Sequence, residues 1–390
     1  MTLHSALKSW NIANKRILLR ADLNAPIANG SIANDYRLQS LQPTIDYIQT
    51  HGGIIVLMSH IGRPKQPTPE LSTQILVPWF RQKGYEITWC PDIATAHQKS
   101  LENNKQIILI ENLRFFPGET SGDKTFAQEL ARCGDYYIDD AFGSLHRNDA
   151  SITLVPQFFA PDHRSIGLLV EKELQMLDRL ISAPQKPFVL IAGGGKVADK
   201  IPLLLHMLDK VTDILLCPAT VFSFLSAQGK AVGKSLVDNQ AAPQCLRILS
   251  QAQERGVTIH FPVDYQIALD AIDGKLMIVD ADAIPFNGVG ISIGPKTVDL
   301  FSSIIANAHT LFFNAAMGFA YRKETLEGTL ALLHAVAKSN GFSVVGGGDS
   351  VAAAQQLEIG NQISYLSTGG GATLSYLSGQ KLPGLEALSN

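Results

Sequence analysis

The sequence predicts an α/β protein with two lobes, each a parallel sheet with helices on both faces, joined by a hinge helix. Short apolar runs that are typical of strands alternate with helix-length segments from one end of the chain to the other. Such alternation indicates βαβ units and parallel sheets. The chain has 390 residues, which is more than a single hydrophobic core usually covers. Its composition, 46% hydrophobic and 17% charged, fits sheets that are covered on both faces.

In the first half, four predicted strands each end in a polar loop. The strands are expected at Ile17–Leu19, Ile54–Met58, Ile107–Ile110 and Tyr136–Ile138. Ligands of open parallel sheets bind beyond the carboxyl ends of the strands. At or near these ends stand the residues that we single out as candidates: Asp22, Asn24, Arg37, His60, Arg63, Arg114, His146 and Arg147. A lone surface arginine is usually only a solvated charge, but several guanidinium groups at one edge favour a site for a small, strongly anionic molecule.

Between the halves, Gly167–Leu174 has few glycines and no proline and is expected to be a stiff interdomain helix. It follows the last arginine loop and precedes the first glycine-rich loop, so we predict domains at 1–170 and 171–371. Four helices are predicted from helix-length segments: Thr125–Arg132, Glu171–Ile181, Lys200–Lys210 and Thr329–Lys338.

In the second half, three glycine triplets each follow an apolar run. They are Gly193–Gly195, Gly346–Gly348 and Gly369–Gly371. Each reads as a strand, a glycine loop and the start of a helix. Glycine lets the backbone approach a phosphate closely, and a helix N-terminus favours an anion. The sequence of this half therefore predicts a binding site for phosphate groups, to which Gly194 and Gly195 contribute.

Two lysines follow the first triplet, Lys196 directly and Lys200 one helical turn later. Side chains at this spacing share a helix face, so both could contact the phosphates of a nucleotide; the alternative is a solvated helix face. The segment also fits the weak dinucleotide pattern G-x-G-x-x-A, which requires an acidic residue after the next strand. The run Ile214–Cys217 ends in Pro218 instead, which disfavours a dehydrogenase.

After the second triplet, Asp349 and Ser350 supply what a nucleotide site still lacks. Magnesium on a nucleotide takes one or two carboxylates together with phosphate oxygens; the alternative for Asp349 is a helix N-cap. Asn314 and Gly318 follow another strand end and are candidates for the same site. No nucleophile–base motif is found, so positioning and electrostatic stabilisation of a moving phosphoryl group is the chemistry that we expect.

Charge and cysteine patterns exclude several classes of protein. The net charge is −3, from 32 basic and 35 acidic residues, which argues against a nucleic-acid partner. We see no signal-peptide core in Met1–Lys15 and no apolar run of about 18 residues, so we expect a cytoplasmic protein with no membrane partner. The four cysteines, at Cys90, Cys133, Cys217 and Cys245, show no C-x-x-C spacing and are expected to be reduced, buried thiols.

Several motifs, in order over nearly the whole chain, closely resemble phosphoglycerate kinase. In the first half they are Arg20-Ala-Asp22-Leu-Asn24, Ser59-His60-Ile-Gly62-Arg63-Pro64, Glu111-Asn-Leu-Arg114 and Asp140-Ala-Phe-Gly143-Ser-Leu-His146-Arg147. Further along they are Gly167-Leu-Leu-Val-Glu-Lys-Glu-Leu174, Gly194-Gly-Lys196-Val-Ala-Asp-Lys200, Gly294-Pro-Lys-Thr297, Gly346-Gly-Gly-Asp349-Ser350 and Ser367-Thr-Gly-Gly-Gly371.

The resemblance implies two Rossmann-like lobes and a glycolytic, monomeric kinase. It would move a phosphoryl group reversibly between 1,3-bisphosphoglycerate and MgADP, giving 3-phosphoglycerate and ATP. The first-half candidates would hold 3-phosphoglycerate, and the tail 372–390 would pack back on the first lobe. Arg37 and Lys196 would stabilise the phosphoryl group in transfer. The binding site for ADP or ATP would be lined by Gly194, Gly195, Lys200, Asn314, Gly318, Gly347, Gly348, Asp349 and Ser350, with Mg²⁺ on Asp349.

Departures from the family pattern gather in the second half. Cys217-Pro218-Ala219 stands in place of a glycine triplet, Ala316 in place of a proline, and Tyr321 in place of the glutamate that would hold the ribose. Ser292 and Ser375 replace acidic residues, and in the first half Asp149 replaces a histidine. The alternative function is therefore a non-catalytic phosphoglycerate-binding homologue with a degraded nucleotide site.

Overall fold

The computed structural model describes residues 4–102, 106–195 and 197–389. Its contacts divide the chain into two compact units. Unit 1 is Met1–Gln175 with Lys381–Asn390, and unit 2 is Met176–Gln380. The division falls inside one helix, α7 (Leu168–Ile181). Within the described ranges, no helix combines the length and the apolar character that crossing a membrane requires.

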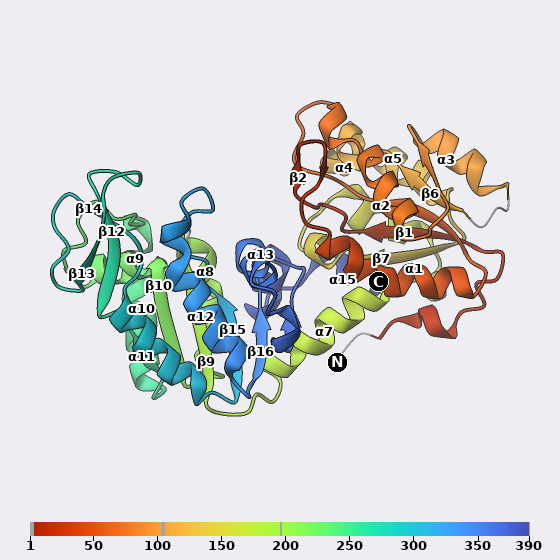
Figure 1. The fold of residues 1–390 in the computed structure, drawn as a ribbon. Coiled ribbons are helices and arrows are strands. Elements are labelled where there is room, and N and C mark those ends of the chain that lie inside the picture. Colours follow the sequence, from red (N-terminus) through yellow and green to blue (C-terminus); the bar gives the residue numbers. More distant parts are fainter. Residues whose placement is uncertain (1–3, 103–105, 196, 390) are drawn as a thin grey trace. The chain divides into compact units, whose positions relative to one another are not determined.

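Unit 1 is built on a six-stranded parallel sheet with the order β5-β6-β4-β1-β7-β8 (Figure 1). The strands are β1 Arg16–Ala21, β4 Ile54–Met58, β5 Ile87–Cys90, β6 Ile107–Ile110, β7 Tyr136–Asp140 and β8 Arg164–Ile166. In the register at the centre of the sheet, Ile17 of β1 pairs with Ile55 and with Tyr136. The four strands that the sequence predicted in this half are confirmed, and the bounds of β4 and β6 are as predicted.

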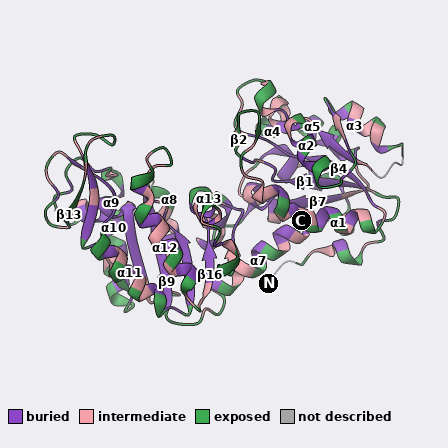
Figure 2. Cartoon of the chain, viewed as in Figure 1, coloured by how far each residue is buried: buried purple, intermediate pink, exposed green. Residues whose placement is uncertain are grey.

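Helices cover both faces of this sheet. Leu19 and Leu57 pack in one core cluster with α1 and α2, while Leu18 and Val56, at the alternate positions, are equally buried. Most strands of the two large parallel sheets are accordingly buried (Figure 2). The helices of the unit are α1 Tyr36–Thr50, α2 Val77–Gln82, α3 Ile93–Ser100, α4 Pro117–Ser121, α5 Lys124–Ala131, α6 Ala150–Thr153 and α15 Pro383–Ser389. A two-stranded ribbon, β2 Ile27–Ala28 with β3 Ser31–Ile32, completes it.

Unit 2 repeats the plan with a parallel sheet of order β11-β10-β9-β15-β16-β17. The strands are β9 Phe188–Gly194, β10 Asp213–Ala219, β11 Thr258–His260, β15 Thr310–Asn314, β16 Phe342–Val345 and β17 Tyr365–Leu366. The helices are α8 Val197–Met207, α9 Thr220–Ala227, α10 Ala242–Glu254, α11 Pro295–Ala306, α12 Glu327–Lys338, α13 Gly348–Gln356 and α14 Gly371–Leu377. Each glycine triplet lies between a strand and a helix, as predicted, although the first triplet overlaps the end of β9. Helix α8 begins three residues before the predicted Lys200 and ends before Lys210.

A second sheet in unit 2 was not expected from the sequence. It is antiparallel, with the order β13-β12-β14, and comprises β12 Asp264–Leu269, β13 Leu276–Asp280 and β14 Gly288–Ile293. The edge strand β13 is exposed at Met277 and Ile278, so it lacks the buried apolar face that would have marked it. The predicted parallel sheet of this half is confirmed, and the antiparallel sheet is an addition to it.

The edges of the two compact units differ from the predicted domain ranges, which stay predictions. The chain rejoins unit 1 at Lys381, where α15 contacts α6 and β8. Helix α14, which lies in the predicted tail, belongs to unit 2: it contacts α8, and the Tyr376 hydroxyl donates to Asp178 Oδ1 at 2.5 Å.

A buried carboxylate, Asp140, sits at the N-terminus of α7. It accepts hydrogen bonds from Thr44 Oγ1 at 2.5 Å and from the Val170 amide at 2.9 Å. Burial raises the pKa of Asp140 to about 7, against these hydrogen bonds. Its neighbour Asp139 is also buried, and burial raises the pKa of that carboxyl to about 6.

We expect Asp140→Asn to weaken the pH dependence of stability. With a raised pKa, the folded state binds more protons than the unfolded state between about pH 4 and 7, so wild-type stability falls as pH rises through that window. Thermal unfolding at pH 5 and pH 8 should show a smaller drop in Tm for the variant. Asp123→Asn, at the exposed cap of α5, is the control and should keep the wild-type drop; an equal drop in Asp140→Asn would contradict the assignment.

Candidate functional site

The loops after β1 and β4 are tied together by Asp22 and Asn24. Asp22 is buried, and both of its carboxylate oxygens accept hydrogen bonds at 2.8 Å from Nη1 of Arg37. Arg37 stands in the first turn of α1. It also accepts the Asn24 amide at 3.2 Å, while Asn24 Oδ1 accepts the Gly62 amide at 2.8 Å. Asp22 thereby holds the Arg37 guanidinium at the carboxyl edge of the sheet.

Behind this edge lies Arg20, the largest fully buried side chain of the described residues. Its Nη2 is 3.0 Å from His60 Nδ1, its Nε donates to Ser151 Oγ at 2.8 Å, and it forms an ion pair with Glu119 at 3.9 Å. Glu119, from α4, also accepts the Ser151 amide and hydroxyl at 2.9 and 2.6 Å. Neither Arg20 nor Glu119 was predicted as a functional residue; an arginine inside an apolar strand run is the signal that could have found the pair.

The ring of His60 is neutral in this setting. Burial, followed by the charges of surrounding guanidinium groups, lowers the pKa of His60 well below its usual value. Those groups are Arg20, Arg114, Arg147 and Arg37. Because Arg20 can only donate, Nδ1 of the neutral ring accepts and Nε2 carries the proton. His60 can therefore offer one N–H donor to an anion without adding a charge.

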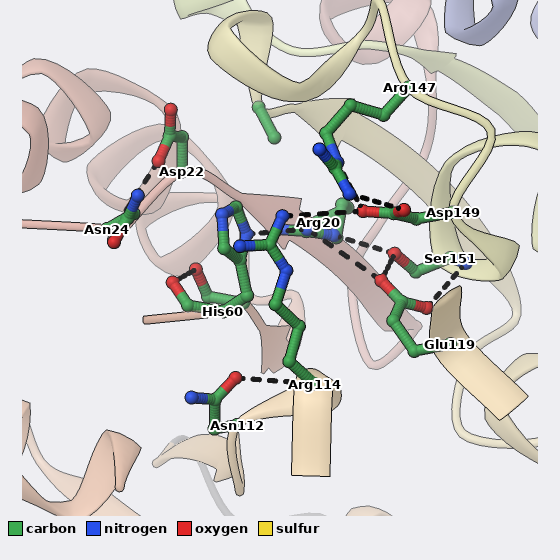
Figure 3. A network of polar contacts seen from close by, with 12 residues as sticks. Arg20, Asp22, Asn24, His60, Asn112, Arg114, Glu119, Arg147, Asp149 and Ser151 are labelled. Atoms are coloured by element: carbon green, nitrogen blue, oxygen red, sulfur yellow. Dashed lines mark hydrogen bonds and ion pairs between the residues drawn. The ribbon is translucent and has the colours of Figure 1, made fainter. Parts of the chain in front are cut away.

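Arg114 and Arg147 share a carboxylate, Asp149 (Figure 3). Arg147 forms a fork with it, Nε to Oδ2 at 2.7 Å and Nη2 to Oδ1 at 3.0 Å, and Arg114 Nη2 lies 3.7 Å from Oδ2. Arg114 also donates to the Gly62 carbonyl, and its backbone is fixed by Asn112, whose Oδ1 accepts the Arg114 amide at 3.1 Å. Burial and the neighbouring arginines lower the pKa of Arg114.

The remaining first-half candidates lie at the same place. Arg63 is exposed and close enough to lower the pKa of Arg114. Burial and the charge of Arg147 lower the pKa of His146, whose buried Nδ1 has no hydrogen-bond partner among the described residues. The structure therefore brings together all eight residues that the sequence predicted in this half. We call Arg20, Arg37, Arg63, Arg114 and Arg147 the arginine cluster.

In unit 2, a lysine of α8 contacts the amide side chain at the end of β15. Lys200 donates from Nζ to Asn314 Oδ1, and Asn314 Nδ2 donates to the Gly346 carbonyl at 2.7 Å. Burial lowers the pKa of Lys200 to about 8. The Thr220 hydroxyl fixes the glycine loop by donating to the Gly194 carbonyl at 2.9 Å. Lys196 lies outside the described residues.

Two further glycines are required by their backbone conformation. Gly347 has φ +96°, and a Cβ on it would meet Asn314 Nδ2 at 2.7 Å. Gly318 has φ +80°, and a Cβ there would lie 2.1 Å from the Thr325 carbonyl oxygen. Gly194 also has positive φ, while Gly195 and Gly348 are exposed. The predicted glycines thus form loops in which the backbone, with no side chain in the way, can face a ligand.

A metal ion in unit 2 would depend on Asp349. Its side chain is exposed in the first turn of α13, beside Gly348, while Ser350 is buried. The described residues contain no group of three or more His, Cys, Asp and Glu side chains that could enclose an ion. One exposed carboxylate next to a glycine loop suits Mg²⁺, which keeps waters and takes phosphate oxygens as ligands.

Two of the sequence departures have visible consequences. Tyr321 is 66% exposed and stacks on Phe319, with ring centroids 5.3 Å apart. Cys217 is fully buried, and a Cβ on Gly193 would lie 2.7 Å from its Cβ. Tyr321 thus presents an aromatic surface, whereas Cys217 serves the packing under the first glycine loop.

Comparison with known proteins gives one family. The family model described as phosphoglycerate kinase matches residues 7–380. A phosphoglycerate kinase from Koribacter versatilis is 39% identical, with 99% of each chain covered, and one from Trichodesmium erythraeum is 37% identical, covering 99% of this chain and 98% of that one. The solved phosphoglycerate kinase of Coxiella burnetii is similar over 98% of both chains, with a TM-score of 0.82 and 33% identity. That of Pyrococcus horikoshii, also over 98% of both, has a TM-score of 0.85 and 29% identity.

The neutral state of His60 can be tested by NMR. Because burial and four guanidinium charges oppose protonation, we expect the His60 ring to stay neutral, with its proton on Nε2, down to pH 5 in the intact protein. Two-dimensional ¹H–¹⁵N spectra of ¹⁵N-histidine-labelled protein distinguish the two tautomers and the cation. Loss of the signal in His60→Gln assigns it. An imidazolium spectrum for His60 at pH 6 would contradict the proposed donor.

Proposed function

The chain belongs to the phosphoglycerate kinase family, and we propose that unit 1 binds the phosphoglycerate and unit 2 the nucleotide. As a member it is a phosphotransferase that acts between 1,3-bisphosphoglycerate and ADP, giving 3-phosphoglycerate and ATP, a step of glycolysis. The alternative, a non-catalytic homologue, is not favoured, since relatives named phosphoglycerate kinase match over nearly the whole chain. That the chain acts as a cytoplasmic monomer without nucleic-acid or membrane partners stays a prediction.

The arginine cluster around the neutral His60 is the observation that best supports the binding of phosphoglycerate by unit 1. A molecule with one phosphate and one carboxylate offers several acceptor oxygens, which match the forks of Arg63, Arg114 and Arg147. His60 Nε2–H and the Asn24 side chain can meet uncharged oxygens or a hydroxyl. We propose that these groups, with Asp22, Arg37 and His146, bind 3-phosphoglycerate.

In the proposed nucleotide site, backbone groups and one lysine ammonium group take the role that the arginine cluster has in unit 1. We propose that Gly194, Gly195, Gly318, Gly347 and Gly348 admit the phosphate chain and that Lys200 and Asn314 fix it. Ser350 at the start of α13 adds a hydroxyl. Asp349 is the residue that would hold Mg²⁺, which when bound neutralises phosphate charge.

Two cations are proposed to act on the phosphoryl group in transfer, Arg37 and Lys196. Asp22 orients Arg37 through its two 2.8 Å contacts, so its remaining N–H groups are held ready for developing charge. Prepositioned donors of this kind stabilise a transition state more than a ground state.

The test of the proposed function is a coupled assay with 3-phosphoglycerate and ATP on wild type and Lys196→Ala. Wild type should turn over, and the variant should lose about 10²- to 10³-fold in kcat with a KM for 3-phosphoglycerate within a few-fold of wild type. Lys338→Ala, an exposed lysine on α12, should match wild type. No wild-type turnover with any nucleoside triphosphate would leave only the binding homologue.

The metal role of Asp349 gives a separate prediction. Asp349→Asn removes the carboxylate and should weaken MgADP binding about 10- to 100-fold, the loss expected for one charged contact, while 3-phosphoglycerate binding stays unchanged. Calorimetry with ADP, with and without Mg²⁺, checks both. Asp299→Asn on α11, also exposed in unit 2, is the control. Equal MgADP affinity in wild type and Asp349→Asn would remove this residue from the metal site.

A further inference from the structure

Asp149 is a carboxylate placed inside a cluster of cations. It is the residue before α6, and its carbonyl accepts the amides of Ile152 at 3.0 Å and Thr153 at 3.1 Å. Its side chain is only 6% exposed. An aspartate at this position usually caps the helix with its carboxylate, but the side chain of Asp149 makes no cap hydrogen bond.

Glu119 explains why the carboxylate of Asp149 is not needed as a cap. The Ser151 amide, in the first turn of α6, donates to Glu119 Oε2 at 2.9 Å. With that donor satisfied, the Asp149 side chain turns to the arginine cluster and takes the Arg147 fork at 2.7 and 3.0 Å, with Arg114 3.7 Å away (Figure 3). The helix start is thus capped from elsewhere, and Asp149 is held against two candidate ligand-binding arginines.

This placement has a consequence for any anion that enters. The two N–H groups of Arg147 that face Asp149 are the paired donors with which a guanidinium binds a phosphate or carboxylate. Unless it displaces this contact, an incoming anion is left with the remaining N–H groups of Arg147, and it meets a like charge next to Arg114. Because the Arg114 and Asp149 side chains are each 6% exposed, solvent screens the repulsion weakly.

We propose that Asp149 is an internal counter-anion that sets the affinity of the arginine cluster for its anionic substrate, by occupying the Arg147 fork and repelling the incoming charge. The inference rests on the proposed binding of 3-phosphoglycerate by unit 1. Asp149 limits binding in the ground state, keeps KM for 3-phosphoglycerate high and favours release of this product. It acts through the arginines and is no catalytic residue.

The test compares wild type with Asp149→Asn and Asp149→Ser, which remove the charge while keeping a side chain suited to the start of a helix. Calorimetry on the intact chain should show 3-phosphoglycerate binding about tenfold more tightly in both variants, the effect of one unit charge at a weakly screened site. The KM for 3-phosphoglycerate should fall by a similar factor, with kcat unchanged or lowered by slower release. Unchanged or weaker binding in both variants would overturn the proposal, the weaker outcome showing that Asp149 orients Arg147 instead.

A matched control exists elsewhere in unit 1. Asp135 holds Arg16 through two guanidinium nitrogens, Nε at 3.2 Å and Nη2 at 2.6 Å from the same carboxylate oxygen. Asp135→Asn should leave the affinity for 3-phosphoglycerate as in wild type, and a matching gain in that variant would contradict a local effect. Inorganic phosphate is the second probe. If it binds more tightly to the Asp149 variants while wild type neither binds nor turns over 3-phosphoglycerate, the counter-anion role stands and the proposed function fails.

Discussion

Unit 1 depends on holding like charges together beside a hydrophobic sheet. Guanidinium groups repel one another, and a buried charge without a partner is costly, of the order of several kcal/mol after relaxation. The structure meets this constraint with carboxylates: each buried or half-buried arginine of the cluster lies beside one, which either belongs to it alone or is shared with a second arginine. Arg20 has Glu119, Arg37 has Asp22, and Arg114 shares Asp149 with Arg147.

The counter-charges also fix geometry, and this links folding to function. Glu119 joins Arg20 to Ser151 at the start of α6, so the buried pair connects the end of β1 with α4 and α6. Breaking such a pair by removing one partner costs about 3–5 kcal/mol. The same pair leaves Nδ1 of His60 facing a donor, which fixes its tautomer. A fully buried arginine thus decides what His60 can offer a ligand.

Local patterns predicted the strands and the loops at their ends because each is encoded within a few residues. An apolar run followed by Ser59-His60 or by Asp140-Ala141 is visible without knowledge of the fold, and β4 and β6 have the predicted bounds. The ion pairs were not visible, because their partners are separated in sequence: Glu119 is 99 residues from Arg20. The sequence shows that Asp149 departs from the family pattern, yet the role that we propose for it depends on the contact between Glu119 and the Ser151 amide. The antiparallel sheet was missed because its edge strand has no buried face.

The sites that we propose in the two units would bind phosphate by different physical means. Unit 1 uses side-chain cations, so it requires carboxylates that keep those cations stable in the absence of ligand. Unit 2 uses backbone at Gly194, Gly318 and Gly347, where positive φ excludes other residues at little electrostatic cost. Backbone groups supply little net charge, so in the proposed nucleotide site charge neutralisation would fall to Lys200, whose burial lowers its pKa to about 8, and to a metal on Asp349. Changes in charge balance should therefore act mainly on the phosphoglycerate side, and changes in backbone freedom mainly on the nucleotide side.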